Sequence, residues 1–419
     1  MKHVLAFLYR WIRLLPPGFR FALKRWLRLS SGKGFGRASR ANVTDELQKL
    51  RGETSETVVV FLPSHPWFSI AFQRPQQMAR ALAECGAVVV YAEIPGRHDD
   101  LLSAEGRERA GENGLQPLDE RLWHLRVPEH FLRKAIRLLR PDAQIFSWPH
   151  QVDYLVEDVG STTVYEMIDD HALLPDAAPW WHATHAAWVR RADIVVASAD
   201  RLLSQLRRER DDAMLLPNAT SVEDWRIDPP PSVPEDMREA RRAETVVGYY
   251  GIIESWFDFE LWAQVAAKKT RWSFVLVGHA TAAVAAQVDA LTSSAPNIFY
   301  LGSKPYAELP AYLAHMDIAT IPFKLNDVTH ATSPLKLFEY MAAGKPIVAT
   351  PMREIIKYKS VLWGEQPGAF VRQLESAVTF AENATYRETL AREAAANTWT
   401  ARAAELLAAI RAKRSPSTQ

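Results

Sequence analysis

The chain has 419 residues, of which 50 are Lys or Arg, 49 are Asp or Glu and 48% are apolar. This is the composition of a globular protein with more than one domain. The formal net charge of +1 gives no overall field that favours nucleic acid, so we expect no nucleic-acid partner. The single cysteine, Cys85, excludes an intramolecular disulfide and a zinc site built mainly from thiolates, and it favours a reducing cytoplasm.

The N-terminal 44 residues are strongly basic. Residues 1–44 contain ten Lys or Arg and no acidic residue, and apolar residues recur at helical spacing on both sides of the segment 16–18, Pro-Pro-Gly. Neither half is long and uncharged enough to span a bilayer, and Arg10 and Arg13 interrupt the apolar run that a signal peptide needs. We predict an amphipathic arm that binds the anionic inner face of the cytoplasmic membrane peripherally. The alternatives are a helical hairpin packed on the protein itself and a disordered basic tail.

From residue 57 onward, short apolar runs alternate with amphipathic helical segments, of which the clearest is residues 74–86. The stretch 228–235 holds four prolines and reads as a linker, after which the alternation starts again. Helices are predicted in the second half at 260–268, 281–292 and 306–316. Strands are predicted at 57–63, 87–95, 121–128, 144–149, 162–169, 192–199 and 213–219, then at 244–251, 272–278, 297–302, 317–322 and 346–350.

Strands separated by helices predict an α/β fold, with two Rossmann-like, doubly wound parallel sheets. Ligands of such sheets bind at the carboxyl ends of the strands, and we expect a cleft between the two domains. The chain has neither G-x-G-x-x-G nor a P-loop motif, so dinucleotide and P-loop chemistry are not indicated. The predicted parts are an arm at 1–44, a first domain at 45–228, a Pro-rich linker at 229–240, a second domain at 241–390, and a C-terminal helix and tail at 391–419.

The most informative segment is 333–350, SPLKLFEYMAAGKPIVAT. Ser333 is a good N-cap and Pro334 suits the first helical position, so a helix is predicted from here to Gly344, followed by a buried strand. A helix N-terminus beside Lys336 is a natural place for phosphate. Glu339, one turn further, can accept hydrogen bonds from two adjacent hydroxyls such as those of a ribose. The segment predicts a site for a nucleoside diphosphate.

Other candidate residues follow predicted strands. Gly251 closes the motif GYYG (248–251), and a glycine at such a turn lets backbone approach a phosphate. Asp169, Asp170 and His171 follow a first-domain strand, where acid–base work or contacts to sugar hydroxyls belong; the alternative is a polar turn with an aspartate as helix cap. Arg74 heads a long helix and is a candidate for binding phosphate or acceptor.

Together these strings resemble the two-Rossmann GT-B glycosyltransferases that use nucleotide sugars, particularly the large retaining family (glycosyl transferases group 1) that builds polysaccharides and glycolipids. The resemblance covers about residues 57–380 and is strongest in NIFYLGSKPYAELPAYLAHMDIATIPF (297–323) and in the segment 333–350. It implies transfer of a hexosyl-like group from a sugar nucleotide to a hydroxyl of a glycan or lipid-linked acceptor. No metal or other cofactor is implied, because the helix dipole and basic side chains neutralise the departing diphosphate.

The resemblance also assigns residues. It places the donor in the second domain and the acceptor in the first, with Asp170 and His171 as candidates near the reacting centre. Glu339 matches the second glutamate of the family's E-x7-E motif, which binds ribose. The diphosphate faces Lys336 and the backbone around Ser333, Pro334 and Leu335.

The sequence departs from the family pattern at two places. The first glutamate of E-x7-E falls on Ala331, where Asn326, Asp327 or His330 could take over its contact to the donor sugar. The basic pair expected after GYYG is replaced by Glu254-Ser-Trp-Phe-Asp258. Two alternatives to a transferase stay open, namely a nucleotide-sugar epimerase on the same fold and a membrane-associated scaffold that has lost catalysis.

Overall fold

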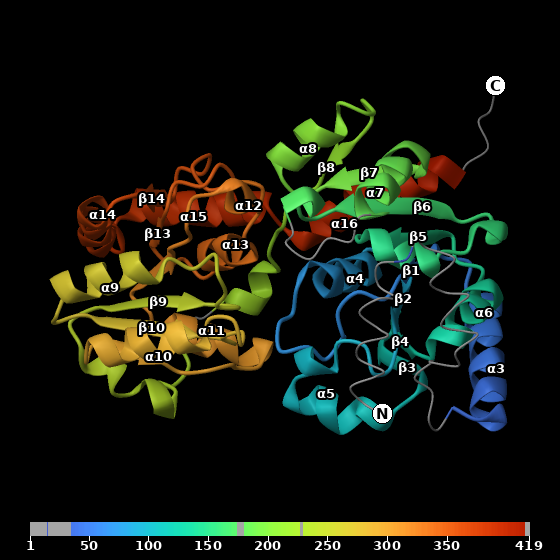
Figure 1. Ribbon diagram of the computed structural model, residues 1–419, viewed down its shortest axis with the longest axis horizontal. Helices are drawn as coiled ribbons and strands as arrows, with labels where there is room; N and C mark the ends of the chain where they lie inside the picture. Colours follow the sequence, from blue (N-terminus) through green and yellow to red (C-terminus); the bar gives the residue numbers. More distant parts are fainter. Residues whose placement is uncertain (1–14, 16–34, 174–179, 227–228, 415–419) are drawn as a thin grey trace. The chain divides into compact units, whose positions relative to one another are not determined.

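The computed structural model describes residue 15 and residues 35–173, 180–226 and 229–414, and shows two compact units, each built around its own sheet (Figure 1). The first unit comprises residues 1–216 and 400–419, and the second comprises residues 217–399. Apart from residue 15 and residues 35–44, the predicted basic arm lies outside the described residues.

The first unit contains an eight-stranded sheet in the order β3-β4-β2-β1-β5-β6-β7-β8. Every neighbouring pair is parallel except β3 with β4. The predicted strands are present, and β3 is the one that the sequence pattern missed: Pro117 lies within it, which only an edge strand tolerates. The strands are β1 Val58–Phe61, β2 Val88–Glu93, β3 Gly114–Asp119, β4 Leu122–Arg126, β5 Ala143–Phe146, β6 Thr162–Met167, β7 Ile194–Ala197 and β8 Met214–Leu215.

Helices at both ends of the chain pack on the first unit. Helix α3 begins at Arg37 and lies beside α6 (Figure 1), with Val43 and Leu47 buried, so the predicted boundary at residue 44 falls inside a helix. Helix α16 follows the second unit in sequence, and its Arg414 is 2.7 Å from Asp142 of the first unit. The helices are α3 Arg37–Glu53, α4 Arg74–Glu84, α5 Ala104–Glu108, α6 Glu129–Leu139, α7 Trp180–Arg191, α8 Asp200–Leu206 and α16 Trp399–Arg414.

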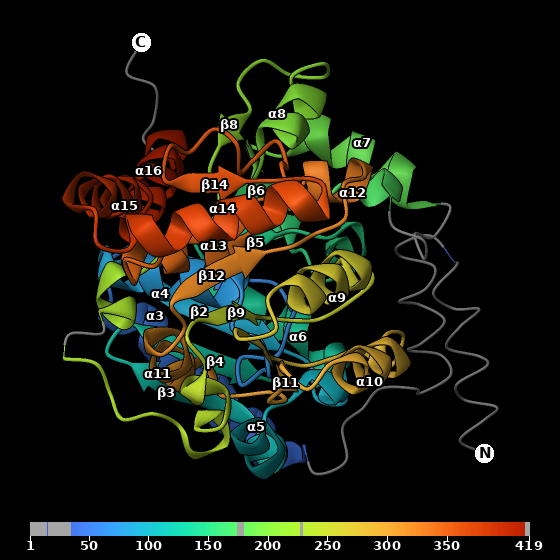
Figure 2. The same cartoon turned by 90° about the vertical axis from the view of Figure 1, so that its left-hand side faces the viewer.

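The second unit contains a six-stranded parallel sheet in the order β11-β10-β9-β12-β13-β14. Its predicted strands are present, and β14, at the edge of the sheet, was not predicted. Helices α13 and α15 pack against each other (Figure 2). The strands are β9 Val246–Tyr250, β10 Ser273–Val277, β11 Ile298–Tyr300, β12 Ile318–Ile321, β13 Ile347–Ala349 and β14 Val361–Trp363. The helices are α9 Phe259–Lys268, α10 Ala285–Ser294, α11 Leu309–Ala314, α12 Asp327–His330, α13 Leu335–Ala342, α14 Pro367–Phe380 and α15 Ala384–Ala396.

The Pro-rich segment predicted as a linker lies within the second unit. Trp225 precedes it, and Met237 and Ala240 lie at its end, and all three are buried in the core of that unit. The prolines interrupt regular structure, but the apolar residues around them are more stable in the core than in water. The observed boundaries, at 216/217 and 399/400, therefore differ from the predicted ones.

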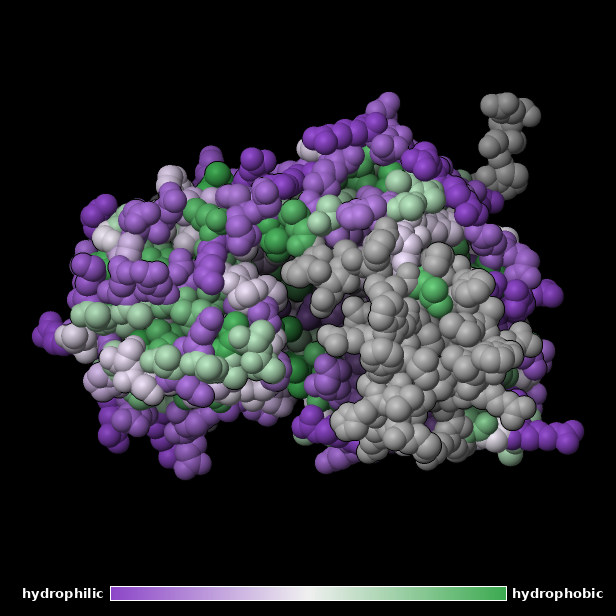
Figure 3. Space-filling model, in the orientation of Figure 1, coloured by the Kyte–Doolittle hydropathy of each residue, from purple (hydrophilic) through white to green (hydrophobic). Residues whose placement is uncertain are grey.

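The surface is mixed in polarity. On the face drawn in Figure 3, hydrophilic residues lie along the edges of the second unit, and apolar residues lie in the middle of that face. Within the described part of the chain, no helix is both long and apolar enough to cross a membrane.

Candidate functional site

Two glycines hold together the carboxyl ends of β9 and β10. Gly251 has φ +128° and Gly278 has φ +144°, both in the region that favours glycine. A Cβ on Gly278 would meet the carbonyl oxygen of Gly251 at 1.9 Å, and the Gly251 N–H donates to the Val277 carbonyl (2.9 Å). Side chains are therefore excluded between the two turns, and Gly278 is a residue that the sequence analysis did not single out.

Lys336 reaches this turn from the first turn of α13. A Cβ on Gly251 would lie 2.9 Å from Lys336 Cε and 3.3 Å from Nζ. The Lys336 ammonium is also 5.1 Å from the ring centre of Tyr249 and 5.0 Å from that of Phe323. Burial lowers the pKa of Lys336 to about 8, against the opposing effect of Glu339. A partly desolvated cation against exposed backbone is suited to an anionic group.

Glu339 lies one turn further along α13 and is only 4% exposed. Tyr250 donates its hydroxyl to Glu339 Oε2 (2.6 Å), and Tyr306 donates to Oε1 over a longer distance (3.4 Å). Burial raises the pKa of Glu339 to about 7, although the Tyr250 hydrogen bond and Lys336 favour its charged form. A carboxylate offers about four lone-pair sites. Two tyrosines therefore leave acceptor capacity on Glu339.

An aromatic ring packs against the two tyrosines that bind Glu339. Trp225 stacks on Tyr250 (5.3 Å between ring centres, 9° between planes) and meets Tyr306 edge-on at 5.7 Å. The backbone N–H of Tyr250 donates to the Tyr340 hydroxyl (3.2 Å). These residues fix the position of the carboxylate. Their role does not follow from the sequence pattern, although Tyr250 lies within the GYYG motif.

The start of α13 differs from the prediction by one residue. The helix begins at Leu335, and the N-cap is Pro334 with φ −72° and ψ 123°; Ser333 is not the cap. Pro334 adopts this extended conformation as readily as the helical one, because its ring fixes φ alone. Asn218 holds the buried Ser333 by donating to its carbonyl (2.6 Å). The N–H groups of Leu335 and Lys336 begin the helix and have no acceptor within it.

The structure places His330 and Ala331 at the end of the short helix α12. His330 is partly exposed, and its Nδ1 accepts from the Arg353 N–H at 3.4 Å. Ala331 is buried, so the position that matches the family's first glutamate carries no polar group.

Arg74, predicted as a candidate phosphate or acceptor contact, is buried in an ion pair. Its Nη2 is 2.7 Å from Glu166 Oε1, its Nη1 donates to the Leu216 carbonyl (2.9 Å), and only 3% of the residue is exposed. The opposite charge that a phosphate would supply is thus already present as Glu166. The surroundings of Arg74 do not support the predicted contact.

Asp170 and His171, predicted as candidates near the reacting centre, are likewise enclosed. Asp170 accepts from the Ala172 N–H (3.1 Å) and from Gln205 Nε2 (2.7 Å), which is the structural role of a turn-capping aspartate. His171 is 2% exposed, and burial lowers its pKa to about 3, with His185 and His182 adding to the effect. Asp169 differs in that its side chain is partly exposed. Its pKa is raised to about 7 by partial loss of solvent and by the neighbouring charge of Asp170.

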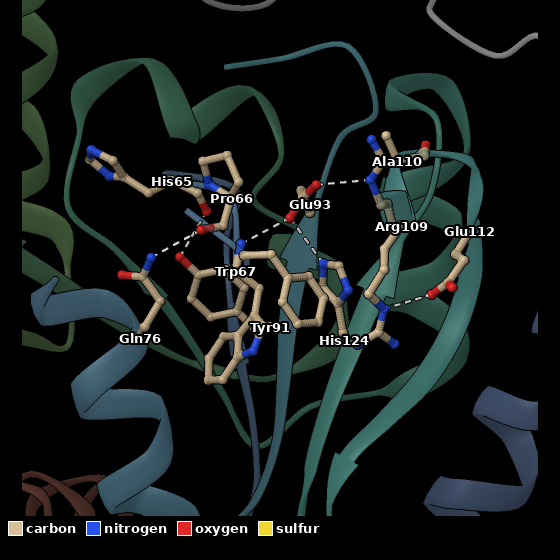
Figure 4. Close-up of polar contacts among 12 residues, drawn as sticks. His65, Pro66, Trp67, Gln76, Tyr91, Glu93, Arg109, Ala110, Glu112 and His124 are labelled. Carbon is tan, nitrogen blue, oxygen red and sulfur yellow. Dashed lines mark hydrogen bonds and ion pairs between the residues drawn. The ribbon is translucent and has the colours of Figure 1, made fainter. Parts of the chain in front are cut away.

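A polar network that the sequence analysis missed orders the loop after β1. Glu93, at the end of β2, accepts from the Trp67 N–H (3.0 Å), faces His124 Nε2 (3.0 Å) and accepts from Arg126 Nε (2.8 Å). Burial raises the pKa of Glu93, but these partners outweigh burial and hold the pKa below its usual value. Figure 4 shows the ring of His65 pointing away from this network, while its carbonyl accepts from Tyr91 (2.9 Å).

No group of three His, Cys, Asp or Glu side chains in the described part of the chain is arranged to hold a metal ion.

The chain is similar in sequence to known glycosyltransferases. Residues 254–383 match the family model described as glycosyl transferases group 1. TuaH of Bacillus subtilis (strain 168), a relative named for glycosyl transfer in teichuronic acid biosynthesis, is 26% identical over 210 residues, which are 48% of this chain and 52% of TuaH. The chain thus spans about half the length of this curated relative.

Solved structures share the fold over most of the chain. Sucrose-phosphate synthase from Thermosynechococcus elongatus (14% identical, TM-score 0.63) covers 86% of this chain and 100% of its own. Trehalose 6-phosphate synthase from Burkholderia multivorans (12%, TM-score 0.62) covers 86% and 99%. HepE from Anabaena, solved with UDP and glucose (14%, TM-score 0.59), covers 85% and 99%. At these identities the likeness shows the fold alone, and it confirms the predicted GT-B architecture.

Proposed function

We propose that the chain is a member of the glycosyl transferases group 1, whose family model matches residues 254–383, and that it transfers a sugar from a nucleoside diphosphate to a hydroxyl of a glycan or lipid-linked acceptor. The observation that carries this proposal is the pair Lys336 and Glu339 on one face of α13. Lys336 supplies a cation beside Gly251, and Glu339, one helical turn further, supplies a carboxylate that Tyr250 holds in place.

In the proposed reaction, the ribose hydroxyls donate to the lone pairs of Glu339 that the tyrosines leave available. Lys336 and the first N–H groups of α13 offset the charge that develops on the departing diphosphate. Because Lys336 is partly desolvated, its effect on that charge is larger than it would be in water. No metal is required for this step, and we expect none in the resting protein.

The acceptor and the site of action are further parts of the proposal. The name of TuaH links that relative to teichuronic acid, and this supports a glycan of the cell surface as product. The basic residues of the segment 1–44 support peripheral binding to the inner face of the membrane. Deletion of residues 1–34, which leaves helix α3 intact, should move the protein from the membrane to the soluble fraction, and unchanged partitioning would reject the anchor.

The donor sugar meets a site that differs from the family pattern. Ala331 is buried and lacks the carboxylate that the resemblance expects, so the sugar contact falls to neighbouring groups such as His330. Retention at the anomeric carbon is expected from the resemblance, and NMR of the freshly formed product measures it. Binding of sugar nucleotides without any transfer would instead identify a scaffold that has lost catalysis.

The test of the nucleotide site compares UDP, GDP and dTDP with inorganic pyrophosphate, by calorimetry on the full chain. Wild type should bind at least one nucleotide more tightly than pyrophosphate, and Glu339→Ala should remove that difference while pyrophosphate binding persists. Glu388→Ala, an exposed carboxylate on α15, is the matched control. If neither wild type nor Glu339→Ala binds any nucleotide, the proposal is wrong.

A further inference from the structure

A cluster of aromatic side chains lies where the order of the first sheet reverses. Strand β1 lies between β2 and β5. The strands β2, β3 and β4 lie on one side of β1 in the sheet, and the strands from β5 onward lie on its other side. Ligands of open α/β sheets bind beyond the carboxyl ends of the strands at such a point. Here the loop after β5 carries Trp148 and His150, and the loop after β6 carries His171.

The rings lie close to one another. Trp148 is 5.2 Å from His171 and 6.1 Å from Trp181, between ring centres, and Trp181 is 5.7 Å from His150. Trp181 comes from the first turn of α7, which packs on the segments that hold the other rings. A hydrophobic core would bury all of these rings, as it buries Trp225. Trp148, His150 and Trp181 are instead each partly exposed.

The loop that carries Trp148 is held rigidly. Gln151 accepts from the backbone N–H groups of Ser147 and Trp148 (2.7 Å each). Its amide donates to the carbonyls of Leu62 (2.8 Å) and Pro63 (3.0 Å), in the loop after β1. An indole on a fixed loop binds a ligand without the entropy cost of ordering the loop.

The cluster also contains a buried polar atom without a good hydrogen bond. His171 is 2% exposed, and its Nε2 makes no hydrogen bond of good geometry among the described residues, although the Ser147 backbone is near enough to the ring to favour a higher pKa. Its Nδ1 is 3.3 Å from the Tyr165 hydroxyl, which is 2.7 Å from His185 Nδ1. A buried nitrogen without a good hydrogen bond costs free energy, and in either tautomer it can exchange a hydrogen bond with a hydroxyl group.

We propose that Trp148, Trp181 and His150 form a stacking surface for a pyranose ring of the acceptor saccharide, and that His171 Nε2 hydrogen-bonds one of its hydroxyls. The C–H face of a pyranose is apolar and fits an aromatic ring, while its edge carries hydroxyls. Partly exposed aromatic faces next to an imidazole nitrogen match both features. This assignment rests on the proposed function and gives its acceptor a chemical class, a saccharide with an exposed pyranose ring.

The test titrates full-length protein with methyl glycosides of glucose, galactose, N-acetylglucosamine and N-acetylgalactosamine. Saturation-transfer NMR and tryptophan fluorescence report binding, and UDP affinity is measured in parallel. Trp181→Ala and Trp148→Ala should each raise the dissociation constant of the bound glycoside about tenfold, as for the loss of one aromatic contact, with UDP affinity unchanged. Trp363→Ala, which removes a half-exposed tryptophan of the second unit, should change neither value.

Conservative variants keep the test decisive if an alanine variant folds poorly. Trp181→Phe should retain most of the affinity, and His171→Gln should retain more affinity than His171→Ala. Equal dissociation constants in wild type and Trp181→Ala, or no binding of any glycoside to wild type, overturn the assignment. If saccharide binding depends on Trp181 while no nucleotide binds, the saccharide surface stands and the proposed transfer reaction fails.

Discussion

Lys336 lies against Gly251 so closely that a Cβ at position 251 would be 2.9 Å from its Cε. Glycine is required at this position for two reasons. Its φ of +128° disfavours any residue with a side chain, and the absence of a Cβ leaves room for the lysine. This relation joins the motif GYYG to the motif SPLKLFEY, which are far apart in the chain.

Gly251→Ala should therefore displace the Lys336 ammonium. We expect about tenfold weaker UDP binding and a loss of about 1–3 kcal/mol in the free energy of unfolding, from backbone strain. Gly302→Ala is the matched control, because Gly302 also has positive φ (+70°) but nothing lies within 4 Å of the added methyl group. Calorimetry and urea denaturation measure both quantities. Equal loss of UDP affinity in the two variants would contradict the role of contact with Lys336.

The affinity for UDP should pass through a maximum between pH about 7 and about 8. Glu339 accepts two hydroxyls best when ionised, above its pKa of about 7, and Lys336 attracts the diphosphate only when protonated, below its pKa of about 8. Titrations across this range, corrected for ionisation of UDP itself, measure the profile. In Glu339→Gln the rise on the acidic side should disappear. A profile that this substitution leaves unaltered would exclude Glu339 as the titrating group.

Arg74→Ala should destabilise the first unit strongly. The variant leaves Glu166 buried without its partner, which costs about 3–5 kcal/mol in the free energy of unfolding. Replacing both residues by methionine removes both charges and should cost much less. Urea denaturation measures these values, and Arg137→Ala is the control.

Arg137 pairs with Asp158 at 3.0 Å, but both side chains are largely exposed. Its loss should lower the free energy of unfolding far less than the loss of Arg74 does. A comparable loss in Arg74→Ala would mean that water reaches the Arg74–Glu166 pair.

Asp169 should make stability fall as the pH rises. Its pKa is raised from 3.8 to about 7 by burial and by Asp170, so between these values the folded state binds more protons than the unfolded state. Stability then decreases with rising pH across this window. Asp169→Asn should match wild type near pH 4 and be the more stable protein above pH 7, as followed by thermal unfolding at a series of pH values. Parallel curves for the two proteins would contradict the raised pKa.

Much of the fold was predictable because its signals are local. Short apolar runs rich in β-branched residues, such as Val58–Phe61 and Ile347–Ala349, are typical of buried strands, and glycines such as Gly344 mark where helices end. The same patterns missed β3, which carries a proline, and placed the start of α13 at Ser333, because Pro334 fits both sides of a helix boundary.

The sequence by itself determined that α13 presents Lys336 and Glu339 one turn apart, because helical spacing follows from residue number alone. Only the tertiary structure decided what surrounds them. Tyr250, Tyr306 and Trp225 converge on Glu339 from three separate segments, and Arg74 finds Glu166 across 92 positions of the chain. Burial raises the pKa of Glu339 and lowers that of Lys336, and this burial is created by packing between distant segments, which no local pattern encodes.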